Sequence, residues 1–493
     1  MGDPRSRQAL AGQFQAPRRA DTADATKHAV AAKASWSRRI TVFCVASAAI
    51  GLLSPNPYLT AGGLLVLPML FVLLWKVGEP PVLLFAAVFQ WLQVFVPVLR
   101  ANSRGEAVGS DASLPELGTA AWLGLIAIVV LALGMRLGRG RRSIVSQNQL
   151  KAWVAQLSPS RLLVAYFTAL AFSLFALGRE PFPGLRQGLL ALSVLRWMAA
   201  FLVLWSAMNE RRFRRGAVLV VAIEVVLGFG GFFSSFKTII FLTTLVLLGS
   251  EQRVRLLRPG VIGLLGGGLF LMTYWQAIKV DYRSFLNAGT DAQVILVSPQ
   301  QRLSFLFDRS VSLTLDEMYA ALDPGLARLG YIDFFAMTIE QVPRHIPYQR
   351  GQLWGEALTH LVTPRIFFPS KEVINDSDRT NTYSGIRVAG GEAGTSVSLG
   401  YVAESYIDFG PVLMFLPICL VGVLWGWSYR WLATRGSNQL LGLSAATMVI
   451  LIGAILFESS NIKLLGGAVT NILVLTALLD LWGDRLWGLL TAR

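Results

Sequence analysis

The chain has 493 residues, of which 54% are hydrophobic and only 15% are charged. Soluble globular proteins carry about 25% charged residues, so this composition excludes an ordinary soluble domain and indicates a membrane protein. The net charge of +15 does not indicate a nucleic-acid-binding protein, because the basic residues stand between apolar runs rather than along one soluble face. Two cysteines, Cys44 and Cys419, and three histidines are too few for a disulfide framework or a histidine-rich metal site.

The N-terminal segment 1–36 is rich in Ala, Arg, Gln and Asp and shows no apolar periodicity. This composition predicts a disordered basic tail on the cytoplasmic side. We do not expect a cleavable signal peptide, because the apolar stretch before Ala46-Ser47-Ala48 is too short.

Apolar runs of roughly 17 to 22 residues follow, each long enough to cross a hydrocarbon core of ~30 Å. Pro55 and Pro57 separate the first two runs. Residues 216–249 would form a helix of roughly 50 Å, too long for one crossing, so we predict a turn near Gly228 and Gly230. The sequence thus predicts about twelve transmembrane helices, at 38–54, 58–75, 80–99, 117–135, 161–178, 187–208, 216–231, 233–249, 259–279, 409–429, 439–457 and 464–482.

The arginines predict the orientation of these spans, because cytoplasmic loops carry an excess of positive charge. With the N-terminus inside, the cytoplasmic connections hold arginine clusters, and the short outward loops hold acidic residues such as Glu106 and Asp111. Both termini are then cytoplasmic, and residues 280–408 form one large periplasmic loop of short, partly amphipathic helices. The predicted organisation is a tail at 1–36, spans one to nine within 37–279, a loop domain at 280–408, and spans ten to twelve with the C-terminus at 409–493.

Charged side chains inside the predicted spans need a partner or a polar cavity, since a charge at mid-membrane costs several kcal/mol. Arg196 stands in the sixth span, Glu224 in the seventh, and Lys237 at the start of the eighth. Two interpretations stay open. Arg196 and Glu224 form a structural pair, or these residues line a cavity in the outer half of the bundle that binds an anionic lipid headgroup.

The loop 280–408 brings further cations near the membrane surface. Arginine's planar guanidinium matches phosphate oxygens. Among these cations we favour Arg283, fixed at a span end, and Arg365, which follows Pro364 and precedes an aromatic pair, as anion ligands. The other candidates in the loop are Arg344, Arg350 and Lys371.

Three residues are candidate general bases. Glu356 and His360 lie one helical turn apart and share a face, and Glu404 stands at the entry to the tenth span. A structural role is the alternative for each. No nucleotide-binding loop occurs in the sequence. Asp376-Ser377-Asp378 matches the D-x-D pattern of nucleotide-sugar enzymes, but on the outward side we interpret it as a turn.

The loop motifs resemble a known family. Trp354-Gly355-Glu356, Thr363-Pro364-Arg365-Ile366-Phe367-Phe368, Thr395-Ser396-Val397-Ser398 and Glu404-Ser405-Tyr406-Ile407-Asp408-Phe409-Gly410 are similar to segments of Wzy-type O-antigen and exopolysaccharide repeat-unit polymerases, relatives of the O-antigen ligases. The resemblance covers residues 350–412 in detail and the remaining chain in layout. It implies an all-α polytopic protein of the bacterial inner membrane with a GT-C-like polymerase/ligase architecture.

The resemblance also implies an activity. Oligosaccharide repeat units on undecaprenyl pyrophosphate would be joined on the periplasmic face, the growing glycan moving from its pyrophosphate onto a hydroxyl of another unit. The pyrophosphate would be bound, without a metal or other cofactor, by Arg283, Arg365 and Lys371, with Arg196 or Lys237. The acceptor hydroxyl would be deprotonated by His360, Glu356 or Glu404. A chain-length regulator and a flippase are the implied partners beside membrane lipid. An O-antigen ligase acting on lipid A core and a polysaccharide or lipid transporter are the alternatives.

Overall fold

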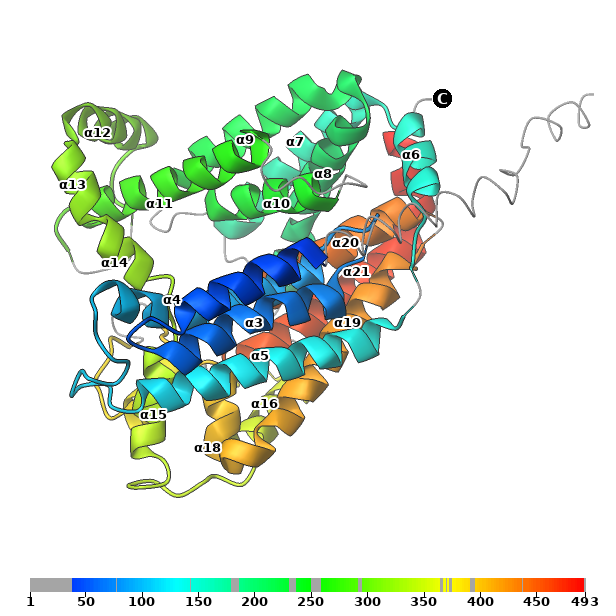
Figure 1. Ribbon diagram of the computed structural model, residues 1–493. Coiled ribbons are helices and arrows are strands. Elements are labelled where there is room, and N and C mark those ends of the chain that lie inside the picture. The colour runs from blue at the N-terminus through cyan, green and yellow to red at the C-terminus, as the bar shows by residue number, and fades with distance from the viewer. Residues whose placement is uncertain are drawn as a thin grey trace, which may run out of the picture.

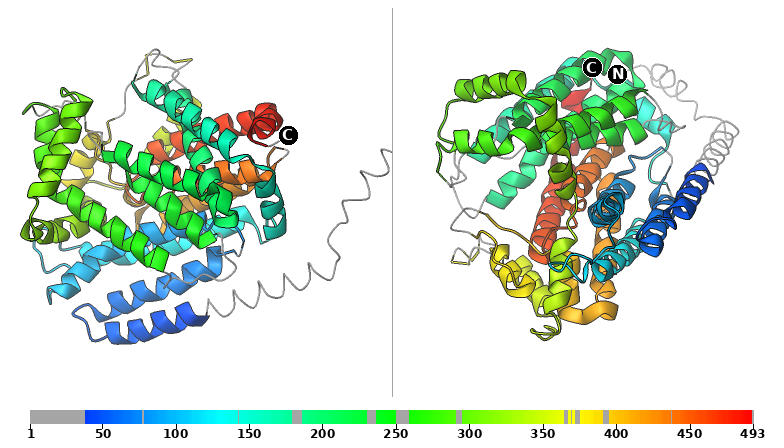
Figure 2. Two further views of the ribbon diagram at one scale, coloured as in Figure 1. Left: turned by 90° about the horizontal axis from the view of Figure 1, so that it is seen from above. Right: turned by 60° about the vertical axis from the view of Figure 1, so that its left-hand side comes forward.

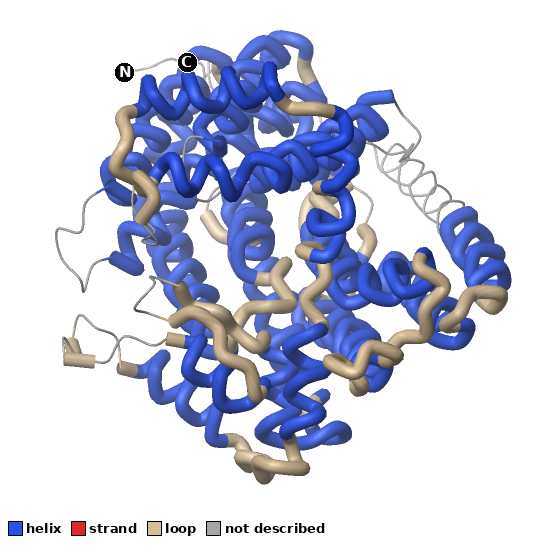
Figure 3. The backbone as a smooth tube through the Cα atoms, turned by 90° about the vertical axis from the view of Figure 1, so that its left-hand side faces the viewer, coloured by secondary structure: helices blue, strands red, loops and turns tan. Residues whose placement is uncertain are grey.

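The computed structural model describes residues 38–491, apart from gaps at 77, 142, 179–185, 230–235, 250–258, 291–294, 364–366, 369, 372–374, 391–394 and 437. Within these described residues every regular element is a helix, and no strand occurs (Figure 3). The predicted all-α class is therefore confirmed. The predicted tail at 1–36 lies outside the described residues.

A helix coincides with each predicted span, beginning with residues 38–51. Seven helices in the described part of the chain are long and apolar enough to cross a membrane, namely α3, α4, α5, α7, α8, α19 and α21, while α10 and α20 are apolar but shorter. The protein is therefore embedded in a membrane by several helices, and the full count of twelve stays a prediction. The helices at the predicted spans are α3 (Pro57–Leu74), α4 (Val82–Ser103), α5 (Leu117–Arg139), α7 (Pro159–Gly178), α8 (Arg186–Asn209), α9 (Arg214–Phe229), α10 (Phe236–Gly249), α11 (Pro259–Leu286), α19 (Phe415–Ala433), α20 (Gln439–Gly453) and α21 (Asn461–Leu490).

The predicted break within 216–249 is confirmed, because α9 ends at Phe229 and α10 begins at Phe236. The rings of these two phenylalanines stack with their centroids 4.6 Å apart. Gly228 allows this approach, since a Cβ at that position would lie 2.4 Å from the backbone nitrogen of Phe236. The two helices therefore pack against each other at the predicted turn.

The loop region also folds as expected, into short helices. The helix at the ninth predicted span, α11, runs on to Leu286, beyond the predicted span end at 279. We predicted a turn at Asp376-Ser377-Asp378, and this prediction is wrong, because these residues begin helix α17. The Asn375 side chain accepts the Ser377 N–H at 3.0 Å at the start of this helix. Outside the loop region, the short helix α6 (Gln147–Gln156) was not predicted. The loop helices are α12 (Pro299–Ser312), α13 (Leu315–Ala320), α14 (Leu322–Ala327), α15 (Asp333–Gln341), α16 (Gln352–Val362), α17 (Asp376–Ser384) and α18 (Tyr401–Leu413).

The helices divide the molecule into two ends. Figure 1 shows α3, α4, α5 and α19 side by side below α7 to α11, with α20 and α21 between these groups. The short helices α12 to α15 gather at one end, which we name the loop end. The C-terminus and α6 lie at the other, which we name the terminal end, and the left view of Figure 2 shows the same separation.

Glycines bring α5 and α19 into direct backbone contact. Gly134 and Gly138 on α5 face Gly422 and Gly426 on α19. A Cβ at Gly426 would lie 2.0 Å from the carbonyl oxygen of Met135, a distance that no side chain tolerates. Both helices thus carry the small-xxx-small spacing that allows close packing between membrane helices.

A buried polar cluster fixes the terminal end of the same helices. Glu79, between α3 and α4, forms an ion pair with Arg139 at the end of α5. The Glu79 carboxylate also accepts the Ser143 hydroxyl at 2.8 Å, the Ile144 N–H at 2.9 Å and the Tyr429 hydroxyl of α19 at 3.3 Å. Because these contacts satisfy the buried charges, the cluster holds together the α3–α4 connection, the end of α5 with the residues after it, and α19.

We predict that Gly426→Val destabilises the protein by about 3 kcal/mol, because the added side chain forces α5 and α19 apart. Gly466→Val is the matched control, since nothing lies within 4 Å of a Cβ built at that glycine of α21. Reversible unfolding in mixed micelles measures both. Equal stability of the two variants would show that the glycine contact is not needed.

Candidate active site

Helix α18 is fixed at the loop end by its first residues. Gly400 precedes it with φ +95°, and a Cβ there would lie 2.6 Å from the carbonyl oxygen of Phe457. Tyr401 donates its N–H to the Ser459 carbonyl at 2.7 Å and its hydroxyl to Gln90 Oε1 of α4, also at 2.7 Å. The first turn of α18 is therefore locked against the connection between α20 and α21.

This locking buries Glu404, one of the predicted bases. Its side chain is 1% exposed, and its Oε2 accepts the backbone N–H of Asn461 at 2.8 Å. Burial raises the pKa of Glu404 to about 8, although the Asn461 N–H and the positive charge of Arg379 act in the opposite direction. The neutral form of Glu404 is therefore favoured more than it is in an exposed glutamate.

Arg379 of α17 connects Glu404 with Glu356. Its Nη1 lies 3.7 Å from Glu404 Oε1, and its Nη2 forms an ion pair with Glu356. The Glu356 side chain is 47% exposed and that of Arg379 is 18% exposed, so the cluster runs from the interior to the surface. The structure thus brings two of the three predicted bases together, through an arginine that the sequence analysis missed.

The helix that carries Glu356 is held at its N-terminus by Asp408. The Asp408 carboxylate accepts the N–H groups of Leu353 at 3.1 Å and Trp354 at 2.9 Å, and burial raises its pKa. The Trp354 indole N–H also donates to Ser405 Oγ at 3.1 Å. A carboxylate on the first N–H groups of a helix satisfies donors that lack partners within the helix. Asp408 therefore positions α16 against α18.

The C-terminus of α16 is held by Lys371. The Lys371 ammonium donates to the carbonyl oxygens of His360 at 2.5 Å and Thr363 at 2.7 Å. His360 is half-buried, one turn beyond Glu356 on the same helix. The structure therefore gathers His360, Glu356 and Lys371 on α16 and its end, whereas the predicted ligand Arg365 lies outside the described residues.

A second buried acid, Asp376, lies near Glu404. Its Oδ2 forms an ion pair with Lys463 at 2.7 Å and accepts the Ser460 hydroxyl at 3.0 Å. Its Oδ1 and both side-chain polar atoms of Asn461 have no hydrogen-bond partner among the described residues. Buried polar atoms of this kind are usually satisfied by ordered water, so this part of the site suits water-mediated polar contacts.

Three cations lie near Glu458, in the connection between α20 and α21, and a fourth lies near one of them. Lys237, Arg328 and Lys463 each lower the pKa of Glu458 by their positive charge, while burial raises it more strongly. Arg283 lies close enough to Arg328 for that charge, together with burial, to lower the pKa of Arg283. We name Lys237, Arg283, Arg328 and Lys463 the cationic group. It contains two predicted ligands and two cations that the sequence analysis missed.

Arg196 lies apart from this group. Its guanidinium forms a buried ion pair with Glu224, with Nε 2.6 Å from Oε1, and Glu224 also accepts the Tyr166 hydroxyl at 2.8 Å. The structure thus contains the structural pair that the sequence left open, and an anion-binding role of Arg196 stays a prediction. In the loop, Arg344 forms an exposed pair with Glu116 at 3.0 Å, and Arg350 is exposed.

The described residues contain no group of three or more histidines, cysteines, aspartates and glutamates arranged to hold a metal ion. The polar groups of the site are instead carboxyls and cations. Such a set can move a proton at Glu404 and stabilise negative charge beside the cationic group.

We predict that Glu224→Leu costs about 3–5 kcal/mol of stability, because it leaves the Arg196 guanidinium buried without a counter-charge. The double variant Arg196→Met/Glu224→Leu should recover most of this loss, since it replaces both charges with apolar groups. Unfolding in mixed micelles compares the variants. If the double variant were as unstable as the single one, the pair would not explain the burial of Arg196.

A protein-family model described as a domain of unknown function, DUF8712, matches residues 126–459. The match extends from α5 to the connection between α20 and α21, so it includes Glu356, Arg379 and Glu404 and ends before Lys463. No curated protein and no solved structure matches the chain. Because the model covers about two thirds of the 493 residues, the chain belongs to the DUF8712 family.

Proposed function

We propose that the protein is a metal-independent glycosyltransferase that polymerises oligosaccharide repeat units linked to undecaprenyl pyrophosphate. The observation that carries this proposal is Glu404, a buried carboxyl with a pKa of about 8, beside Arg379 at the loop end. In this proposal about twelve spans in a GT-C-like arrangement cross the bacterial inner membrane. Both termini are cytoplasmic, and the loop end faces the periplasm.

Glu404 is the proposed general base. A base works best when its pKa lies near the pH of the reaction, and burial brings Glu404 into that range. Its Oε1 faces Arg379, which connects it with the exposed Glu356. The hydroxyl oxygen of the acceptor sugar bonds to the anomeric carbon of the donor. As this bond forms, the ionised Glu404 carboxylate accepts the proton of that hydroxyl. Glu356 and His360, on α16, are the alternative bases nearer to the surface.

The cationic group is the proposed site of the leaving group. When the anomeric carbon–oxygen bond breaks, the pyrophosphate departs with the electron pair, and its negative charge needs fixed cations nearby. Lys237, Arg328 and Lys463 are exposed and Arg283 is half-buried, so a diphosphate can reach them. Arg365 and Lys371 stay predicted ligands of the pyrophosphate.

The direct test is to incubate the purified protein with one defined undecaprenyl-pyrophosphate oligosaccharide and to separate the products by gel and mass spectrometry. A ladder that rises by whole repeat units supports the proposal. If intact substrate stays a single unit, the polymerase proposal is wrong. Transfer to added lipid A core would then identify a ligase.

We predict that polymerisation depends on the ionisation of Glu404. The base must be deprotonated, so the rate should rise about tenfold per pH unit up to about pH 8 and then level off. Glu404→Gln should remove most of the activity, by about 100-fold or more, together with this pH dependence. Asp378→Asn, which removes an exposed carboxylate from α17, is the matched control and should behave like the wild type. An unchanged pH profile in Glu404→Gln would exclude Glu404 as the base.

We predict that Arg328→Gln weakens binding of the pyrophosphate-linked substrate about tenfold, because a hydrogen bond to a charged group contributes about 1.5 kcal/mol. The measured quantity is the KM for the lipid-linked oligosaccharide, together with the affinity for inorganic pyrophosphate as a competitor. Arg387→Gln removes an exposed loop arginine outside the cationic group and serves as the control. Equal KM values for both variants would contradict the assignment of the leaving-group site.

A further inference from the structure

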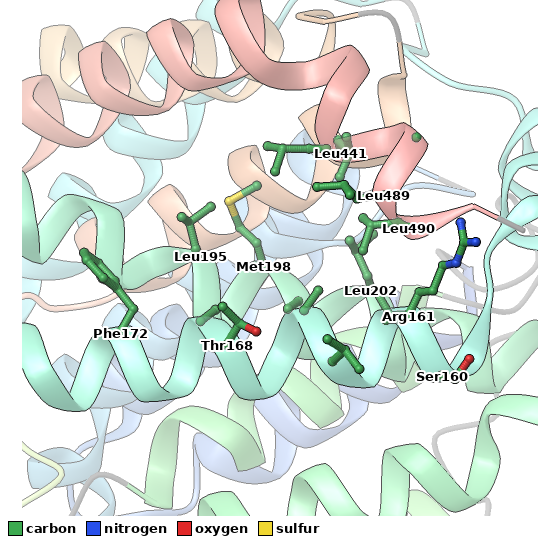
Figure 4. A pocket seen from close by; sticks show the side chains of 17 residues that line it. Ser160, Arg161, Thr168, Phe172, Leu195, Met198, Leu202, Leu441, Leu489 and Leu490 are labelled. Atoms are coloured by element: carbon green, nitrogen blue, oxygen red, sulfur yellow. The ribbon is translucent and has the colours of Figure 1, made fainter.

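A large apolar cavity lies at the terminal end, away from the candidate active site. It has a volume of about 860 Å³ and is bounded by α7, α8, α20 and α21. Figure 4 shows Leu195, Met198 and Leu202 of α8 along one side of it and Leu441 and Leu489 on another. None of the described residues that line this cavity belongs to the Glu404 cluster or to the cationic group.

Polar and apolar side chains are distributed unevenly along the lining of the cavity. Among the described lining residues, only Ser160, Arg161 and Thr168 have polar side chains. Ser160 and Arg161 stand together at the start of α7, next to the C-terminal residues of α21, whereas the described lining beyond them is apolar apart from Thr168. The cavity therefore has one cationic end and a long apolar body.

Arg161 holds its place by donating a hydrogen bond to the carbonyl oxygen of Thr491. A guanidinium carries five N–H donors, so one such bond leaves most of its capacity for a ligand. Arg161 is exposed at the surface of the bundle, where a headgroup can reach it. Its geometry matches a phosphate better than any neutral group.

The length of the cavity corresponds to one leaflet of a bilayer. From Arg161 to Phe172, α7 rises by about 17 Å at ~1.5 Å per residue. Half of a ~30 Å hydrocarbon core is about 15 Å. A chain that enters beside Arg161 would therefore end near the middle of the membrane.

We propose that this cavity binds an acyl chain of an anionic phospholipid, whose phosphate the Arg161 guanidinium contacts. The charged end selects an anionic headgroup, and the apolar body accepts the chain. The bound lipid fills the space between the α7–α8 pair and the α20–α21 pair, so it stabilises the native protein by mass action. The site is independent of the proposed enzymatic function.

The test uses the full-length protein, delipidated in detergent and titrated with dioleoyl phosphatidylglycerol, dioleoyl phosphatidylcholine or dihexanoyl phosphatidylglycerol. Native mass spectrometry counts the bound lipids, and thermal unfolding reports stabilisation. We expect one tightly bound long-chain phosphatidylglycerol, weaker binding of phosphatidylcholine, and no stabilisation by the short-chain lipid. Equal binding and stabilisation by all three lipids would overturn the proposal.

Three variants separate the two parts of the site. Arg161→Gln should reduce the affinity for long-chain phosphatidylglycerol about tenfold and remove its advantage over phosphatidylcholine. Thr168→Trp fills the cavity from an exposed position, where it disturbs no buried packing, and should abolish binding of both long-chain lipids. Lys151→Gln removes an exposed cation of α6 outside the cavity and should leave binding unchanged. Wild-type binding in Thr168→Trp would place the lipid elsewhere on the surface, and an unchanged headgroup preference in Arg161→Gln would remove the phosphate contact.

Discussion

The direct backbone contact between α5 and α19 is the constraint on which the rest of the structure depends. The two helices cannot slide or separate without losing the close backbone packing at four glycines, Gly134, Gly138, Gly422 and Gly426. α19 follows α18 after a bend at Gly410, where φ is +71°. The position of α18, and with it that of the buried carboxyl it carries, is therefore set by a contact made deep in the bundle.

The two ends of the bundle differ in how far their buried polar and charged groups are paired within the protein. At the terminal end, the Glu79–Arg139 pair is enclosed, and every partner belongs to the protein. At the loop end, Asp376 and Asn461 keep polar atoms that have no partner among the described residues, and three cations lie near Glu458. An enclosed, fully satisfied cluster stabilises a fold, whereas a partly satisfied one leaves interactions for other molecules.

Hydrophobic runs and helix-breaking residues predicted the positions of the helices well, because a span is a local property of the sequence. The break before Phe236 and the short helices of the loop could be predicted in the same way. The glycine contact could also have been predicted, since the pairs Gly134/Gly138 and Gly422/Gly426 have the required spacing. It is not among our predictions from the sequence.

The candidate site could be predicted only in part, since its contacts join residues far apart in the chain. Glu356 and Glu404 stand out in local motifs, but nothing local indicates that Arg379 joins them. Nothing near Asp376 in the sequence indicates its partner Lys463, which lies 87 positions further on, beyond α18, α19 and α20. Long-range pairing of this kind depends on how the helices pack, which a single sequence does not specify.

The two anchors of α16 have a consequence for how a reaction at the loop end would start. Asp408 fixes the first turn of this helix, and Lys371 fixes its last carbonyl groups. A helix of eleven residues held at both ends loses little conformational entropy when a ligand arrives. The backbone that carries Glu356 and His360 is thus preorganised, so in the proposed reaction less binding energy would be needed to order this segment.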